Sequence, residues 1–308
     1  MTLIPLDGGI KIMTFKPPAG FNPLTASPDD VIKNGFPARP EDPHHLARYQ
    51  RVLGQLNGKL NYIEPTFRVN PDRRHGPRMR RPEDGTETST NWSGGVVYAP
   101  SGQSFKWVEG DWTVPNVDAP TQNQWYYCSS WVGIDGDQTS DVCQAGVECE
   151  VFQSGSTITR HIYPWWEWFS SPEVQITNLA INPGDMVTML ICSMTGANAT
   201  TATAYFSNRT SGASTSFNFT APSGTKLVGN CAEWIVEAPT VNGAQSAIAD
   251  YGEVFFSVCE AFLTNGTTVN GGTGNNINLT ANGSVVSDGN LISPTIIQCL
   301  YNGAAPMA

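Results

Sequence analysis

The sequence predicts an all-β protein, an antiparallel β-sandwich of two sheets, preceded by an N-terminal extension with one short helix. Short apolar runs recur at close spacing from residue 91 to the C-terminus, separated by Gly, Ser, Asn and Pro. No segment in that part shows convincing helical periodicity. The first 90 residues differ in composition. We therefore expect two regions, an extension over residues 1–90 and a β-domain over residues 91–308.

The two regions differ in the sign of their charge. Residues 1–90 hold 13 of the 17 Lys and Arg but 10 of the 27 Asp and Glu, giving +3, whereas residues 91–308 carry −13. Such a domain either works in acid, where carboxylates are protonated, or is an ordinary acidic protein kept soluble by its charge. It is a poor partner for nucleic acid. No stretch is long and apolar enough to span a membrane, and residues 1–15 show no signal peptide.

The extension is rich in proline and contains one good helix candidate, from Pro43 to Leu60. Asp42 can cap this helix and Pro43 suits its first turn. Its apolar residues would form one docking face, made of Leu46, Tyr49, Leu53, Leu56 and Leu60. The basic run from Arg68 to Arg81 and the polar run up to Thr90 are either an exposed linker, open to processing, or a tail that packs permanently.

Alternating residues and turn signals indicate the strands of the domain. Residues 174–181 and 186–192 are predicted strands, and Asn182-Pro183-Gly184-Asp185 is the turn between them. Residues 253–262 and 291–300 continue the pattern towards the C-terminus. Many short strands without helices are typical of jelly-roll or concanavalin-like sandwiches.

All seven Cys residues follow residue 90, and so do seven N-glycosylation sequons. Together they favour an exported glycoprotein with disulfides, although the odd number leaves at least one Cys unpaired and the pairing cannot be deduced. No CxxC occurs and only His161 lies in this region, so neither a zinc site nor another metal or cofactor is expected. The sequons stand at Asn91, Asn198, Asn208, Asn218, Asn265, Asn278 and Asn282.

Three stretches carry the candidate functional residues. Trp131 to Asp137 runs from apolar residues into a turn, where Gly133 and Gly136 suit a tight reversal, and the uncharged Gln144 follows in a small apolar run. In Ala232 to Glu237, strand alternation places Glu233, Ile235 and Glu237 on one face, which suits the floor of a groove. Trp165 to Phe169 surrounds Glu167 with aromatic side chains, as either a substrate wall or core packing.

Several hydrolytic chemistries lack their residues. Asp-Thr-Gly and Asp-Ser-Gly pairs, GxSxG, HExxH and glycine-rich phosphate loops are all absent. A Ser-His or Cys-His catalyst in the domain would have His161 as its single possible base. Carboxylate chemistry remains, with an amide as a possible electrophilic helper.

Six stretches occur in the order found in the glutamic peptidases, the eqolisin family, and the chain resembles that family over about residues 91–260. They are Asn91 to Gly95, Trp112 to Pro115, Trp131 to Asp137, Gln144 to Gly146, Trp165 to Trp168 and Ala232 to Glu237. The resemblance implies a sandwich of two seven-stranded sheets and an acid endopeptidase with a Gln/Glu dyad. By position, Gln144 and Glu237 would be that dyad. Trp92, Trp131, Asp135, Glu148 and Glu167 would line the cleft.

The implied chemistry suits these residue types. Amide hydrolysis needs a base for water, a donor for the oxyanion and an acid for the leaving amine. Glu237 would take the water proton and return it to the nitrogen, while the neutral Gln144 would hold water and donate its amide N–H to the oxyanion. Polypeptides are the implied substrates, pepstatin would not inhibit, and the implied enzyme is a secreted monomer.

Members of the family are made with a signal peptide and a basic propeptide, and residues 1–90 resemble the second without the first. We expect the extension to mask the cleft and to detach as carboxylates protonate. Ala145, Glu148, Cys231 and a shorter interval between Trp131 and Gln144 depart from the family pattern. These departures concern turn geometry and disulfides more than the dyad.

Two alternatives compete with a peptidase. Glu148 and Glu150 share a strand face, so a glycoside hydrolase with paired carboxyl groups is conceivable. The other is a sandwich that binds glycans or proteins without catalysis, because a fold by itself fixes no function.

Overall fold

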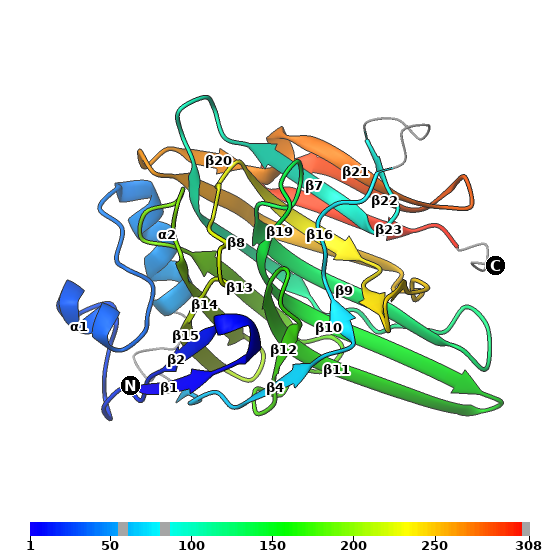
Figure 1. Ribbon diagram of the computed structural model, residues 1–308, viewed down its shortest axis with the longest axis horizontal. Coiled ribbons are helices and arrows are strands. Elements are labelled where there is room, and N and C mark those ends of the chain that lie inside the picture. The colour runs from blue at the N-terminus through cyan, green and yellow to red at the C-terminus, as the bar shows by residue number, and fades with distance from the viewer. Residues whose placement is uncertain (55–60, 81–86, 304–308) are drawn as a thin grey trace.

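The computed structural model describes residues 1–54, 61–80 and 87–303 as two antiparallel sheets packed face to face (Figure 1). The predicted sandwich is confirmed. We call the two layers the front sheet and the back sheet. The described chain contains no helix long and apolar enough to cross a membrane.

The front sheet carries the stretches singled out in the sequence. Its strands are hydrogen-bonded in the order β21-β7-β16-β9-β10-β11-β12-β4. All these pairings are antiparallel, and the last strand belongs to the N-terminal extension. The bounds are β21 Asn275–Ala281, β7 Trp92–Tyr98, β16 Cys231–Glu237, β9 Trp125–Ile134, β10 Cys143–Ser154, β11 Thr157–Trp168, β12 Glu173–Ile176 and β4 Phe67–Asn70.

The back sheet runs in the order β1-β2-β15-β14-β13-β8-β19-β23-β22, again antiparallel, and its first two strands come from the extension. β21 also pairs with β22, so it connects the two sheets. The bounds are β1 Thr2–Pro5, β2 Lys11–Thr14, β15 Ala213–Thr220, β14 Thr201–Asn208, β13 Met186–Cys192, β8 Phe105–Thr113, β19 Glu253–Leu263, β23 Ile296–Tyr301 and β22 Ser284–Ser293.

Short strands and turns complete the described chain. β3 Asn61–Tyr62 and β6 Thr88–Ser89 add parallel to β15 and β21. β20 Thr268–Asn270 pairs with β19, while β5 Arg73–Arg74, β17 Thr240–Val241 and β18 Ala244–Gln245 form a small third sheet. Two 3-10 turns are η1 Asp7–Gly9 and η3 Gly271–Thr273.

Strand alternation places the main core between the sheets. Ala232, Trp234 and Val236 of β16 face that core, as the sequence predicted, and Trp166 and Trp168 of β11 join them. Each of these side chains is almost entirely shielded from solvent. The alternate residues of the same strands face away from the core, and they carry the candidate site.

The extension contains two helices within its described residues, one more than predicted. α1 Pro28–Lys33 begins at Ser27, whose hydroxyl accepts the Asp30 N–H, a capping signal that the sequence interpretation missed. α2 Pro43–Gly54 is the predicted helix, and the end predicted beyond it lies outside the described residues. Tyr49 and Leu53 of α2 are buried against the outer face of the back sheet.

The structure shows free thiols where disulfides were expected, and it buries two of the seven sequons. All seven Cys residues are buried free thiols, so the structure shows no disulfide among them. Asn91 and Asn208 are only 2% and 1% exposed, and both side chains are hydrogen-bonded inside the fold. A glycan on either would require this packing to open.

Candidate active site

Gln144 and Glu237 lie on the outer face of the front sheet, on strands on either side of β9. Across β10, β9 and β16 three rows are in register: Gln144–Gly133–Glu233, Gly146–Trp131–Ile235 and Glu148–Ser129–Glu237. Alternation puts all nine residues on one face. The AEWIVE face predicted as a groove floor is therefore part of an acidic and aromatic surface.

Aromatic side chains stand on this surface. Trp92 lies opposite Glu237 in β7 and packs edge-on against Trp131, with 4.9 Å between ring centroids. Trp165 and Glu167 come from β11, where Glu167 pairs with Gln144. Of the predicted site residues, Trp92, Trp131, Glu148 and Glu167 therefore surround the dyad.

Glycine makes room for this arrangement at Gly146. A Cβ there would lie 2.4 Å from the Ser130 carbonyl oxygen and 2.5 Å from the Trp131 Cβ, so no other residue fits without a shift. The predicted reversal begins later than expected, because Gly133 lies inside β9. Asp135 (φ 73°) and Gly136 (φ 107°) turn the chain instead.

Residues 67–80 of the extension, which we call the strap, pass over this surface. The strap starts with β4, which adds to the free edge of β12 (Figure 1). Of the two alternatives for the basic run, packing is observed over this described part. Ion pairs link Arg73 to Glu150 at 2.8 Å, Arg78 to Asp137 at 2.9 Å and Arg80 to Asp137 at 2.7 Å.

His75 is the strap residue that reaches the dyad. Its carbonyl oxygen accepts a hydrogen bond from Gln144 Nε2 at 2.5 Å, and its Nδ1 lies 3.3 Å from Glu237 Oε2. Its backbone N–H donates to Glu167 at 3.0 Å, and its ring stacks on Trp165 with 3.6 Å between centroids. The side chain is completely buried. One residue of the extension thus contacts both Gln144 and Glu237.

Glu237 is a buried carboxyl with several donors. Trp131 Nε1 donates to its Oε2 at 2.9 Å, and Asn91 Nδ2 lies 3.4 Å from its Oε1. Burial raises the pKa of Glu237, while the contacts with His75, Trp131 and Asn91 act in the opposite direction. Burial would lower the pKa of His75, but hydrogen bonds and charges from Glu173 and Glu237 outweigh it and raise that pKa well above its ordinary value. The His75 ring therefore lies between two carboxyl groups, with Nδ1 near Glu237 and Nε2 near Glu173.

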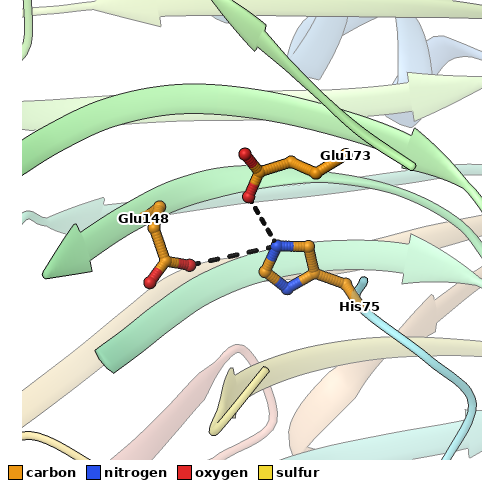
Figure 2. Close-up of side chains that lie close together, drawn as sticks. All are labelled: His75, Glu148 and Glu173. Atoms are coloured by element: carbon orange, nitrogen blue, oxygen red, sulfur yellow. Dashed lines mark hydrogen bonds and ion pairs between the residues drawn. The ribbon is translucent and has the colours of Figure 1, made fainter. Parts of the chain in front are cut away.

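Glu148 and Glu173 lie on the other side of the imidazole (Figure 2). His75 Nε2 is 2.9 Å from Glu173 Oε2 and 3.9 Å from Glu148 Oε2. Neither oxygen of Glu148 has a hydrogen-bond partner, and burial raises its pKa well above the ordinary value. Burial has the same effect on the pKa of Glu167.

The same three residues are the one group, within the part of the chain described here, whose ligand atoms lie close enough for a metal ion, all within 4.8 Å of one another. Two ligands of a tetrahedral zinc ion stand roughly 3.3 Å apart. The separation of 2.9 Å between His75 and Glu173 is instead that of a direct hydrogen bond. As arranged, the three side chains form an ion-paired cluster.

A groove with a volume of about 880 Å³ continues along the front sheet beyond His75. Tyr163, which pairs with Glu148, and Gln175, which pairs with Trp165, line its inner end. Glu150, the second carboxylate of the glycosidase alternative, also lines it and is bound by Arg73, Tyr163 and His161.

Asp135 is placed differently from the other predicted site residues. Its carboxylate accepts the backbone N–H groups of Val228 at 2.7 Å and Asn230 at 2.9 Å, which fixes a neighbouring loop. Burial raises its pKa to about 6 against these donors. Its predicted contact with substrate stays a prediction.

Sequence reasoning missed three residues of the site, His75, Asn91 and Glu173. Asn91 was noted only as a sequon and within a family stretch, and Glu173 follows a Pro in a run without special pattern. His75 stands alone in the Arg-rich run, and that isolation was its sole signal.

Comparison with known proteins identifies the family. The family model of the Peptidase A4 family matches residues 90–301. This chain is a member of the Peptidase A4 family. The resemblance to glutamic peptidases is thereby confirmed. Aspergillopepsin-2 of Aspergillus niger is 28% identical over 220 residues, which are 66% of this chain and 74% of that protein.

Solved structures agree on the fold of this Peptidase A4 member. Scytalido-glutamic peptidase with a transition state analog inhibitor superposes with a TM-score of 0.58 at 24% identity, covering 69% of this chain and 98% of that one. Aspergilloglutamic peptidase from Aspergillus niger gives a TM-score of 0.51 at 26% identity, covering 57% and 99%. The family match begins at residue 90, so the strap lies outside it.

Proposed function

We propose that this peptidase is an acid endopeptidase that hydrolyses polypeptides with the dyad Gln144 and Glu237. One observation carries the proposal: the Gln144 amide and the Glu237 carboxyl converge on a single peptide segment, at the carbonyl and the side chain of His75. A substrate backbone in the place of the strap would meet the same two groups.

The dyad divides the chemistry between a donor and a base. Gln144 donates N–H to the carbonyl oxygen, and the same donor stabilises the negative charge that develops there during attack. Glu237 takes a proton from the attacking water and returns it to the leaving nitrogen. Trp131 and Asn91 hold the carboxyl of Glu237 in position. Gln144 is neutral, so it does not repel the oxyanion as a second carboxylate would.

We further propose that residues 1–90 act as a propeptide-like extension and that residues 91–308 form the peptidase domain. Removal of the strap would vacate the dyad. Ion pairs of Arg73, Arg78 and Arg80 with carboxylates hold the strap, and ion pairs of this kind weaken in acid. An acid pH optimum, resistance to pepstatin, a monomeric state and an extracellular location belong to the same proposal.

Cleavage of an acid-denatured protein tests the dyad. We expect the processed wild type to cut it in acid with pepstatin present. Glu237→Gln should lower kcat/KM by at least about 10³-fold, and Gln144→Ala by about 10²- to 10³-fold. The exposed Glu253→Gln on the back sheet is the matched control and should keep wild-type activity. Undiminished cleavage by Glu237→Gln would refute the proposed base.

A further inference from the structure

The strap lies in the cleft with its backbone held on both sides of one peptide bond. Gln144 binds the carbonyl of His75, and Glu167 accepts its N–H. Beyond it, Asn91 Nδ2 donates to the carbonyls of Gly76 at 3.4 Å and Pro77 at 3.1 Å. The amide donor of the dyad therefore marks the bond between His75 and Gly76 as the one in the position of attack.

The side chain of His75 then shows where the residue before a cleaved bond would sit. Its ring lies flat against Trp165, with an interplanar angle of 9°. Glu173 binds Nε2 at 2.9 Å, while Glu148 faces the same nitrogen from 3.9 Å (Figure 2). We call Trp165, Glu148 and Glu173 the His75 site. All three side chains are fully buried.

Glu148 is the informative member of this site. Both of its oxygens are buried without a hydrogen-bond partner, although burial of a carboxyl is costly unless it is satisfied. The Nε2 atom of His75 carries at most one N–H, and it lies within hydrogen-bond distance of Glu173 but not of Glu148. The ammonium of Lys and the guanidinium of Arg stand on longer stems and carry several donors, so either can reach both.

We propose that the His75 site is the specificity site for the side chain that precedes the cleaved bond, and that it selects basic residues. The inference rests on the proposed function, because Gln144 defines which carbonyl is attacked. In that reaction water adds to the carbonyl carbon and the carbon–nitrogen bond to the next residue breaks. Glu237 passes one water proton to the departing nitrogen, giving a carboxyl group and an amine.

The same geometry explains why the strap can remain uncut. The Nδ1 atom of His75 lies 3.3 Å from Glu237 Oε2, where the attacking water would have to bind. Trp131 Nε1 donates a hydrogen bond to the same Oε2 atom of Glu237. His75 thus fills the specificity site and displaces the water. A Lys in its place lacks a ring nitrogen beside Glu237, so His75→Lys should convert the strap from a plug into a substrate cut after residue 75.

The test uses processed wild-type chain and peptides that differ only in the residue before the cut, Lys, Arg, His or Met. Near pH ~5 imidazole is mostly protonated and Lys and Arg are charged, whereas Met carries no charge. We expect kcat/KM for Lys to exceed that for Met, its uncharged analogue, by about 10-fold or more. Glu173→Gln and Glu148→Gln should reduce that ratio to about 3-fold or less, whereas the exposed Glu253→Gln should leave both the ratio and cleavage of the Met peptide unchanged within about 2-fold.

Binding of product peptides separates this inference from the proposed function, because it needs no catalysis. Peptides ending in Lys should bind the processed chain about 10-fold more tightly than peptides ending in Met, and Glu173→Gln should abolish the difference. Glu253→Gln should preserve it. Equal affinity for both, or a preference that survives Glu173→Gln, would overturn the inference even if proteins are cut. Selective binding without hydrolysis would uphold the site and refute the peptidase.

Discussion

The two ends of the N-terminal extension are attached to the domain by different kinds of contact. Residues 1–54, which we call the anchor, join the back sheet mainly through apolar contacts, together with buried ion pairs of Arg48 with Glu109 and Glu260. The strap crosses the front sheet through charged and polar contacts. Figure 1 shows the two parts on different layers of the sandwich, the helices at one side and β4 beside β12. One continuous basic, Pro-rich stretch therefore combines a part attached mainly by apolar packing with a part attached mainly by ion pairs.

The anchor contributes to the protein core. Ile12 in β2 pairs with Phe219 of β15, and both side chains belong to the cluster between the sheets. Tyr49 and Leu53 of α2 cover Trp107 and other apolar residues on the outer face of the back sheet. Because removal of the anchor would expose this apolar surface to water, we expect it to stay bound after the strap is cut.

Phe67 packs against the main core at the start of the strap, and ion pairs hold most of the strap beyond it. Arg73, Arg78 and Arg80 each bind a carboxylate, and His75 binds two. Such contacts respond to pH and salt, whereas buried apolar area does not depend on protonation. The comparison teaches that the response of an attached segment to pH and salt depends on the kind of contact that holds it.

The largest expected effect is in the anchor. Tyr49→Ala removes a fully buried ring whose hydroxyl donates to the Pro37 carbonyl at 3.1 Å. We expect a loss of roughly 3–5 kcal/mol in the free energy of unfolding. Urea unfolding of the intact chain measures it. Arg51→Ala on the exposed side of the same helix should change stability by less than about 0.5 kcal/mol. Equal effects would mean that the anchor does not share the core.

A smaller effect should appear in the pH dependence of the free energy of unfolding, through Glu109 of β8, which pairs with Arg48 of the anchor. Burial raises the pKa of Glu109 to about 7, reinforced by Glu260 and Asp111, while Arg48 and Trp107 oppose it. A raised carboxyl pKa means that the folded state binds more protons than the unfolded state, so stability present in acid is lost as pH rises to about 7.

Urea unfolding at a series of pH values tests this sign. Between about pH 5 and 8 the wild type should lose on the order of 2 kcal/mol, and Glu109→Gln should lose less. Asp135, with a pKa of about 6, also makes the free energy of unfolding fall with rising pH, and this contribution will remain in both proteins. A wild type that gains stability over this range would contradict the account of the anchor.

The smallest effect should come from the edge of the strap. Arg80 is 35% exposed in its side chain and pairs with Asp137. Because partly exposed ion pairs contribute little, Arg80→Gln should change the free energy of unfolding by less than about 1 kcal/mol. It should nevertheless hasten cutting of the strap in mild acid, which mass spectrometry can follow. A large loss of fold stability would show that the strap is as structural as the anchor.

The sequence predicted the sandwich and the faces of its strands because alternation in β9, β10 and β16 is a local pattern. It also predicted Gln144 and Glu237, because their neighbours resemble a known family in order. It did not predict His75 in the site. The contact between His75 and Glu237 joins residues 162 apart, and no local periodicity encodes such a pairing. Asp135 resembles a cleft residue in sequence, yet the structure uses its carboxylate to hold a loop.

The central claim is that one catalytic dyad becomes available when the strap leaves it. The most direct measurement follows peptide hydrolysis and the intact mass of the purified full chain together after a shift from neutral to acid pH. We predict that hydrolysis begins only as a cut appears between Arg68 and Asn91, and that neither occurs in Glu237→Gln. Hydrolysis by a chain whose mass is unchanged, or a cut chain without hydrolysis, would contradict the account.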